Sequence, residues 1–111
     1  MLHEMKLNNK PFKSIKARSK TIEMRLYDEK RKLVNVRDNI NFINRSTGEE
    51  LLTQVLAIHK FKNFEELYKA FNKSILGYKE NEIANPKDMS QYYSDEDIKK
   101  YGVVGIEIKV I

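Results

Sequence analysis

Polar side chains of different chemistry stand at every second position of one short segment. Thr21, Glu23 and Arg25 alternate with apolar residues, and Lys20 precedes them. In a β-strand, alternate residues share a face, so a strand here gathers these groups on one side. An Arg guanidinium suits a phosphate or a base edge, Glu accepts from an exocyclic amine, and Lys adds a positive charge. The segment therefore predicts a site for a nucleotide or RNA. The alternative is an outward, solvated face that carries a cross-strand ion pair.

Positive charge is concentrated in the first third of the chain. The net charge is +5, and residues 1–37 hold eleven Lys or Arg against four acidic residues. A surplus of this kind favours polyanionic partners. Lys10, Lys13, Lys16 and Arg18 belong to one predicted basic helix, and Lys13 and Lys16 are spaced to share one side of it. Those two are our candidate phosphate contacts. The later run 30–32 indicates a solvated surface rather than a site.

Two adjacent aromatic residues add a possible platform for a base. Tyr92 and Tyr93 have rings on which an unstacked base can lie. Since neighbouring residues point in different directions, we expect one of them to be buried and the other to lie near the site. A protein-interaction module would instead require an exposed apolar patch.

Other classes of chemistry find no support. The chain has no cysteine, and His3 and His59 stand far apart without acidic neighbours at metal-ligand spacing. We therefore expect neither a metal nor a cofactor. The N-terminus lacks the apolar region of a signal peptide, and no run has the length of a membrane span. A cytoplasmic location and no membrane partner are the expectation.

The periodicity of the chain predicts the elements that position these residues. Residues 21–26 form the clearest strand, and 27–33 are a polar turn or a single helical turn. In the long strand 51–61, one face should carry Leu51, Thr53, Val55, Ala57 and His59. Helices are expected at 11–18, after an Asn63 cap and from 94 to 101, with a loop or broken helix at 74–88. Further strands are expected at 3–7, 40–44 and 103–111.

These elements predict an α+β fold. At 111 residues the chain has the size of a single domain, covering 1–111, with one core. No regular βαβ pattern is present, so a small, mostly antiparallel barrel flanked by short helices is the expected packing. Closure of the sheet would remove its exposed edges.

The segment from Met5 resembles the ASCH domain family, whose barrels are PUA-like. The family signature G-x-K-x-x-E-x-R fits residues 18–25, and the flanking segments resemble a bacterial branch of small ASCH proteins over nearly the whole chain. Two departures stand out, because Arg18 and Arg37 occupy positions where glycine is usual. Both positions are expected to need a turn, with positive φ.

The resemblance implies a PUA-like β-barrel with a cleft between barrel and helices that binds RNA or nucleotides. By the same carry-over Lys20, Glu23 and Arg25 line the cleft, and Thr21 joins them because it shares their strand face.

A hydrolase is the alternative. Related ASCH-like enzymes remove the acetyl group from N4-acetylcytidine with a lysine, a threonine and a glutamate, and their strand motif runs K-T-x-T. Here Glu23 occupies the position of the catalytic threonine. Lys20, Thr21 and Glu23 are thus the candidate catalytic residues for an amidohydrolase or a ribonuclease, and recognition is the preferred function.

Overall fold

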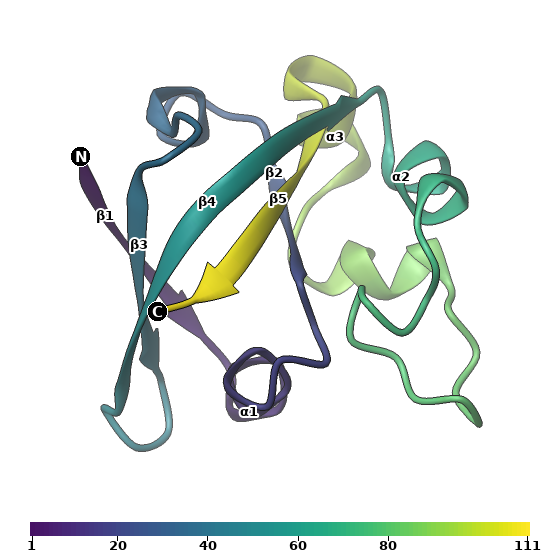
Figure 1. The fold of residues 1–111 in the computed structure, drawn as a ribbon. Helices are drawn as coiled ribbons and strands as arrows, with labels where there is room; N and C mark the ends of the chain where they lie inside the picture. The colour runs from purple at the N-terminus through teal and green to yellow at the C-terminus, as the bar shows by residue number, and fades with distance from the viewer.

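The fold is built on a five-stranded sheet that curls on itself (Figure 1). The structure is a computed structural model that describes all 111 residues. The strand order is β1-β3-β4-β5-β2, and β1–β3 is parallel while the other three pairs are antiparallel. The strands are β1 (Leu2–Leu7), β2 (Ile22–Leu26), β3 (Asn39–Asn44), β4 (Glu50–Phe61) and β5 (Val103–Val110).

The α+β class is confirmed, but the predicted closure of the sheet is not seen. Strands β1 and β2 are the two edges of the sheet and do not pair with each other. The result is a curled half-barrel with a mixed sheet. The parallel strands β1 and β3 are connected through α1, β2 and η1, and a long crossover of this kind is what parallel neighbours require.

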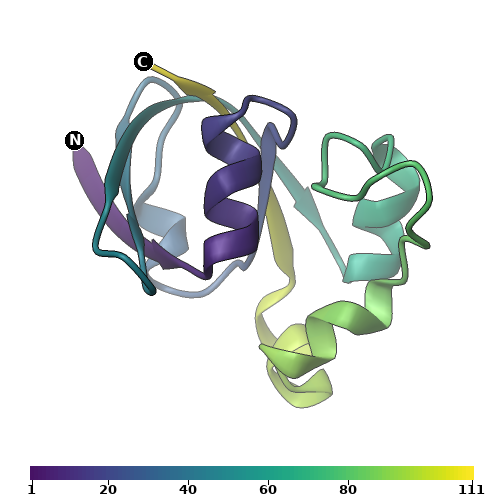
Figure 2. The ribbon, with the colours of Figure 1, turned by 90° about the horizontal axis from the view of Figure 1, so that it is seen from below.

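Helix α1 (Asn9–Lys16) lies along the open side of the half-barrel, between β1 and β2 (Figure 2). Asn8 is extended before the helix and Pro11 stands in its first turn, where the missing N–H removes no intrahelical bond. Phe12 and Ile15, three residues apart, are each only 1% exposed and enter the core inside the curl. These two side chains fix which way the rest of α1 faces.

Two apolar clusters lie on opposite sides of the sheet. The larger fills the curl under α1 and includes Phe12, Phe42 and Ile106. The smaller packs helix α2 (Phe64–Ala70) against β2 and the start of β5, through Leu67, Met24 and other residues. Because Ile22 and Met24 face the second cluster, the alternate residues of β2 turn toward α1.

The remaining helical segments are short. They are η1 (Arg31–Leu33), a 3₁₀ turn within the predicted polar turn, η2 (Pro86–Gln91) and α3 (Asp95–Tyr101). Both predicted caps form, since Asn63 accepts from the Glu66 amide and Ser94 accepts from the Asp97 amide. Of the predicted loop or broken helix at 74–88, residues 74–85 hold only turns and bends, and 86–88 begin η2.

The prediction that one face of β4 carries alternate residues from Leu51 to His59 is wrong beyond Val55. A register shift between Val55 and Ala57 places an extra residue in the strand, so the alternation changes sides there. Ile58 then packs against the core inside the curl. His59 lies on the other side, with its ring 5.0 Å from that of Phe71.

Arg18 and Arg37, which occupy positions where the family usually has glycine, adopt the predicted positive φ. Arg18 has φ 68° and Arg37 has φ 78°, and these are the only residues other than glycine with positive φ. The turn that follows α1 is therefore kept without glycine, at a cost in backbone strain.

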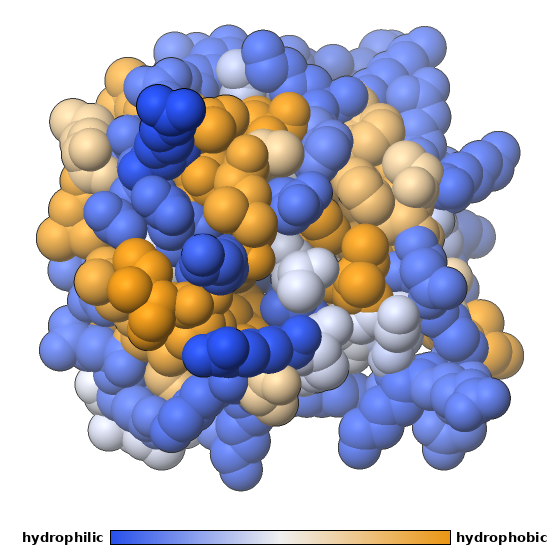
Figure 3. Space-filling model, in the orientation of Figure 1, coloured by the Kyte–Doolittle hydropathy of each residue, from blue (hydrophilic) through white to orange (hydrophobic).

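Apolar side chains also reach the surface. Leu52 and Leu56 on β4 are more than two-fifths exposed, as is Ile111 beside them. In the view of Figure 1, apolar residues gather over the β3–β4 side of the molecule, with charged residues around them (Figure 3). None of the helices has the length and apolar content that a membrane crossing needs.

Candidate nucleotide site between α1 and the 76–93 segment

A cavity of about 600 Å³ opens beside strand β2. The end of β1 and helix α1 form one wall, and residues of the segment 76–93 form the opposite wall together with Tyr68 of α2. Figure 2 shows α1 and this segment on either side of β2. The cavity is lined by Lys6, Leu7, Asn8, Lys10, Pro11, Ser14, Lys20, Glu23, Met24, Arg25, Arg31, Arg45, Tyr68, Leu76, Gly77, Tyr78, Glu82, Asp88, Met89, Gln91, Tyr92 and Tyr93.

Three charged side chains meet at the strand. Glu23 accepts from Arg25 Nε at 2.7 Å, and its other oxygen lies 3.5 Å from Lys20 Nζ. All three side chains are about nine-tenths buried or more. An outward, solvated ion pair is thus the wrong interpretation of this segment. We call Lys20, Glu23 and Arg25 the charged triad; with all three groups ionised it carries one net positive charge.

Burial and pairing set the protonation of the triad. Burial alone would raise the pKa of Glu23, but the charges of Arg25 and Lys20 outweigh it and hold that pKa below its usual value. For Lys20 burial prevails over the attraction of Glu23, so the pKa of its amine is lowered. Burial alone would lower the pKa of the Arg25 guanidinium, but the attraction of the Glu23 carboxylate outweighs burial and raises that pKa.

The turn at 75–77 holds Lys20 in place. Lys20 Nζ donates to the Leu76 carbonyl at 3.1 Å, and the backbone amides of Thr21 and Ile22 both donate to the Ile75 carbonyl. Gly77, at φ +104°, leaves room for the lysine, since a Cβ there would stand 3.1 Å from Lys20 Cδ. The Lys20 amine is thus held by a turn more than fifty residues later in the chain.

Four of the six tyrosines of the chain line the cavity. Tyr92 and Tyr93 both line the cavity, rather than one being buried away from it: Tyr93 is partly buried and stacks on Phe64, while Tyr92 is 53% exposed. The Tyr68 and Tyr78 hydroxyls lie 2.8 Å apart, and Tyr78 donates to Asp88. Burial is the first cause that raises the pKa of Tyr78, so this hydroxyl stays protonated.

The structure brings together Lys20, Glu23, Arg25, Tyr92 and Tyr93, but not the other three predicted residues. Thr21, Lys13 and Lys16 do not line the cavity. Thr21 precedes the paired part of β2, where alternation does not yet set its direction. Lys13 and Lys16 face away because Phe12 and Ile15 set the rotation of α1, and Lys16 pairs with Glu49.

Several lining residues were missed by sequence reasoning. Lys10 stands in the predicted basic helix and reaches across to Glu82, 2.8 Å away. Tyr68 belonged to a helical stripe assigned to the core, and Arg31 to a run assigned to solvent. For Tyr78 and Arg45 no signal exists, because their segments show no period that would place them beside β2.

The lining offers few groups for covalent catalysis. Apart from the tyrosines, Ser14 supplies the only hydroxyl, and it donates to the Lys10 carbonyl within α1. No cluster of three or more His, Asp or Glu residues is placed to hold a metal ion. The cavity therefore offers a bound molecule fixed charges and aromatic rings, which suits recognition.

Comparison with known proteins agrees with this architecture. The model of the ASCH domain matches residues 5–111. The hypothetical protein PH0355 is 34% identical with a TM-score of 0.85, and the match covers 100% of both chains. Protein PF0455 from Pyrococcus furiosus is 35% identical with a TM-score of 0.73, over 100% of this chain and 98% of that one.

A more distant structure shares the fold. The S128A mutant of ZmASCH from Zymomonas mobilis is 13% identical, with a TM-score of 0.69 over 97% of this chain and 67% of that one. No curated protein matches the sequence.

Proposed function

The chain belongs to the ASCH domain family, and from this premise we propose that it binds RNA or a nucleotide in the cavity beside β2. The observation that carries the proposal is the buried charged triad at the side of a cavity lined by four tyrosines. The family resemblance implies the same class of ligand.

The size and lining of the cavity support a nucleotide-sized ligand. Its volume of about 600 Å³ falls within the roughly 300–1,000 Å³ of small-molecule sites. Tyrosine rings provide faces on which a base stacks, and each such contact is worth about 1–3 kcal/mol. Tyr92 is the most accessible ring for this purpose, as it is half exposed at the rim.

Charge supports an anionic ligand. Six basic and three acidic residues line the cavity, so the lining is net positive. The triad is held by its own contacts before any ligand arrives, and such preorganisation lowers the cost of binding. Lys20 and Arg25 then present donors to a base edge or phosphate, beside the acceptor oxygens of Glu23.

Hydrolysis is the second candidate, and the lowered pKa of Lys20 favours it. An amine that is more readily neutral serves as a proton acceptor or a nucleophile. Recognition ranks first because Thr21 lies outside the cavity lining and Ser14 is engaged within α1, which leaves no free aliphatic hydroxyl near the triad. A hydrolase here would have to activate water.

Titration of RNA oligonucleotides and of the four ribonucleoside monophosphates at two salt concentrations tests the proposal. We expect binding that weakens with salt, and a lower affinity for Lys20→Gln and for Tyr92→Ala. Lys16→Gln, on the same basic helix but outside the cavity, is the matched control. The absence of binding, or equal affinities for all three variants, would refute the proposal.

Incubation with N4-acetylcytidine and with RNA separates the second candidate from the first. If the native chain turns over either substrate and Glu23→Gln does not, hydrolysis replaces recognition as the proposed function. Turnover that persists in Glu23→Gln excludes Glu23 as the catalytic group.

A further inference from the structure

A second, smaller hollow adjoins the cavity beside β1 and η1. It has a volume of about 260 Å³ and is lined by Glu4, Met5, Lys6, Arg25, Lys30, Arg31 and Arg45. We call it the basic annex. We propose that the annex binds the phosphate group of a nucleotide whose base occupies the cavity. The proposal rests on the proposed function and deepens it, because it assigns a place to the phosphate of the RNA or nucleotide ligand.

The annex holds cations that no carboxylate neutralises. Five of its seven lining residues are basic and only Glu4 is acidic. Of these five, Arg25 and Arg31 pair with Glu23 and Asp28, while Lys6, Lys30 and Arg45, like most Lys and Arg side chains of the protein, take part in no ion pair. Three unpaired cations around one hollow repel one another, and a bound anion would relieve that repulsion.

Arg31 supplies a donor that lacks an acceptor. Its Nε is buried and makes no hydrogen bond, and it is the one such side-chain atom in the protein. The rest of the side chain is fixed, because Asp28 accepts from Nη1 at 2.8 Å and from the Arg31 amide at 3.1 Å. Buried donors nearly always have a partner, and Arg31 lines the annex, so we infer that its vacant Nε–H meets an acceptor oxygen when an anion is bound there.

The annex and the cavity share four residues, which makes them parts of one site. Lys6, Arg25, Arg31 and Arg45 line both hollows. Arg25 is the member of the triad that also lines the annex, and its Nε and Nη2 are already bound to Glu23 and to the Lys6 carbonyl. A ligand that fills both hollows must carry an aromatic part and an anionic part, linked by a short spacer such as a ribose. A nucleotide has this form.

The test compares each ribonucleoside with its 5′- and 3′-monophosphates, by calorimetry and by the Arg Nε–H signals in ¹⁵N spectra. Inorganic phosphate alone is the additional probe. We expect the better monophosphate to bind at least about tenfold more tightly than the nucleoside, as a charge-assisted contact allows. The Arg31 Nε–H signal should move with the monophosphate and not with the nucleoside. Arg45→Gln, an exposed change that should leave the fold intact, is expected to remove most of the tenfold difference.

Lys109→Gln, an exposed change outside both hollows, is the control and should behave as the native chain. Equal affinity for nucleoside and monophosphates, or an Arg45→Gln variant that keeps the difference, overturns the annex while the proposed function stands. If no nucleoside or nucleotide binds but inorganic phosphate moves the Arg31 signal only with Arg45 present, the proposed function fails and the annex remains an anion site. No response to any probe overturns both.

Discussion

Arg25 Nη2 donates to the main-chain carbonyl of Lys6 at 3.0 Å, and this bond joins the two edge strands of the curled sheet. Through Nε the same guanidinium donates to Glu23. A single side chain thus spans the seam between β1 and β2 and neutralises the buried carboxylate beside the cavity. The seam and the candidate site are therefore expected to respond together to changes at this residue.

Replacing Arg25 should destabilise the fold more than its position at a sheet edge suggests. Arg25→Gln leaves Glu23 buried with only Lys20 opposite, and breaking a buried pair in this way costs about 3–5 kcal/mol. Arg25→Lys keeps the charge but loses the planar guanidinium, so its amine can bind the Glu23 carboxylate or the Lys6 carbonyl but not both. We expect an intermediate loss, measured by urea unfolding.

Arg18→Gln is the control for removing an arginine with no carboxylate partner, and its effect should stay within about 0.5 kcal/mol. An Arg25→Gln variant as stable as this control would show that the triad does not depend on the guanidinium.

The sequence predicted the parts of the site that depend on local pattern. Alternation at 21–26 placed Glu23 and Arg25 on one face, because a strand leaves no other arrangement. The positions where the family usually has glycine predicted the positive φ of Arg18 and Arg37, since a turn constrains φ whatever residue occupies it.

What the pattern missed depends on contacts between distant segments. The wall that holds Tyr78 comes from irregular chain, and its contact with Lys20 spans more than fifty residues. The rotation of α1, which turned Lys10 and not Lys13 toward the cavity, follows from how Phe12 and Ile15 meet the sheet. The bulge at Val55–Ala57 likewise has no local signature.

Gly77→Ala should disturb Lys20 as well as the turn. Any L-residue at φ +104° is strained, and a Cβ there would also stand 3.1 Å from Lys20 Cδ. We expect a loss of about 1–3 kcal/mol in unfolding free energy, together with weaker nucleotide binding because the amine is displaced.

Gly48→Ala is the matched control for Gly77→Ala. Gly48 also has positive φ, at +77°, but a Cβ there would meet nothing within 4 Å. It should lose some stability and keep the ligand affinity of the native chain. If the two variants bind equally well, Gly77 has no role in positioning Lys20.

Arg18→Gly should stabilise the chain slightly. It relieves a left-handed conformation that costs about 1–2 kcal/mol for an L-residue, and the extra freedom of the unfolded glycine returns part of that gain. We expect a net gain of about 0.5 kcal/mol, measured by thermal unfolding. Arg18→Ala, which keeps the strain, should show no gain. A loss in Arg18→Gly would mean that the arginine side chain itself stabilises the turn.

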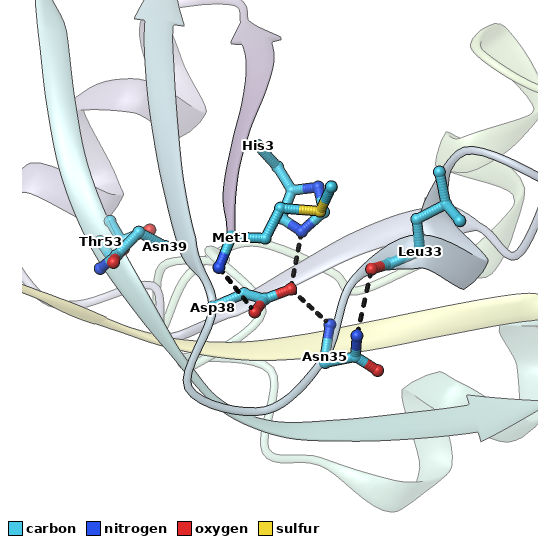
Figure 4. A network of polar contacts seen from close by, with 7 residues as sticks. All are labelled: Met1, His3, Leu33, Asn35, Asp38, Asn39 and Thr53. Atoms are coloured by element: carbon cyan, nitrogen blue, oxygen red, sulfur yellow. Dashed lines mark hydrogen bonds and ion pairs between the residues drawn. The ribbon is translucent and has the colours of Figure 1, made fainter.

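Asp38 should make stability depend on pH in the acid range. Its carboxylate lies 2.8 Å from His3 Nε2 and accepts from the Asn35 amide (Figure 4). These hydrogen bonds, that of His3 first, lower its pKa from 3.8 to about 2. A lowered carboxyl pKa contributes stability above pH 3.8, and the contribution is lost as the pH falls toward 2. The stability difference between the native chain and Asp38→Asn should therefore shrink over that interval, and a difference independent of pH would contradict this assignment.

Tyr92 and Tyr93 should separate binding from stability. Tyr93 stacks on Phe64 and packs on the cluster beneath α2, so Tyr93→Ala should cost about 2 kcal/mol of unfolding free energy as well as affinity. Tyr92 is half exposed at the rim, and Tyr92→Ala should change stability by less than about 0.5 kcal/mol. Its affinity for single-stranded RNA should fall by about 1–3 kcal/mol, the worth of one stacked base. Tyr92→Phe keeps the ring and should bind as the native chain does, because stacking uses the ring face and not the hydroxyl. If Tyr92→Ala binds with native affinity, the base does not stack on Tyr92, and one of the three other tyrosines must hold it.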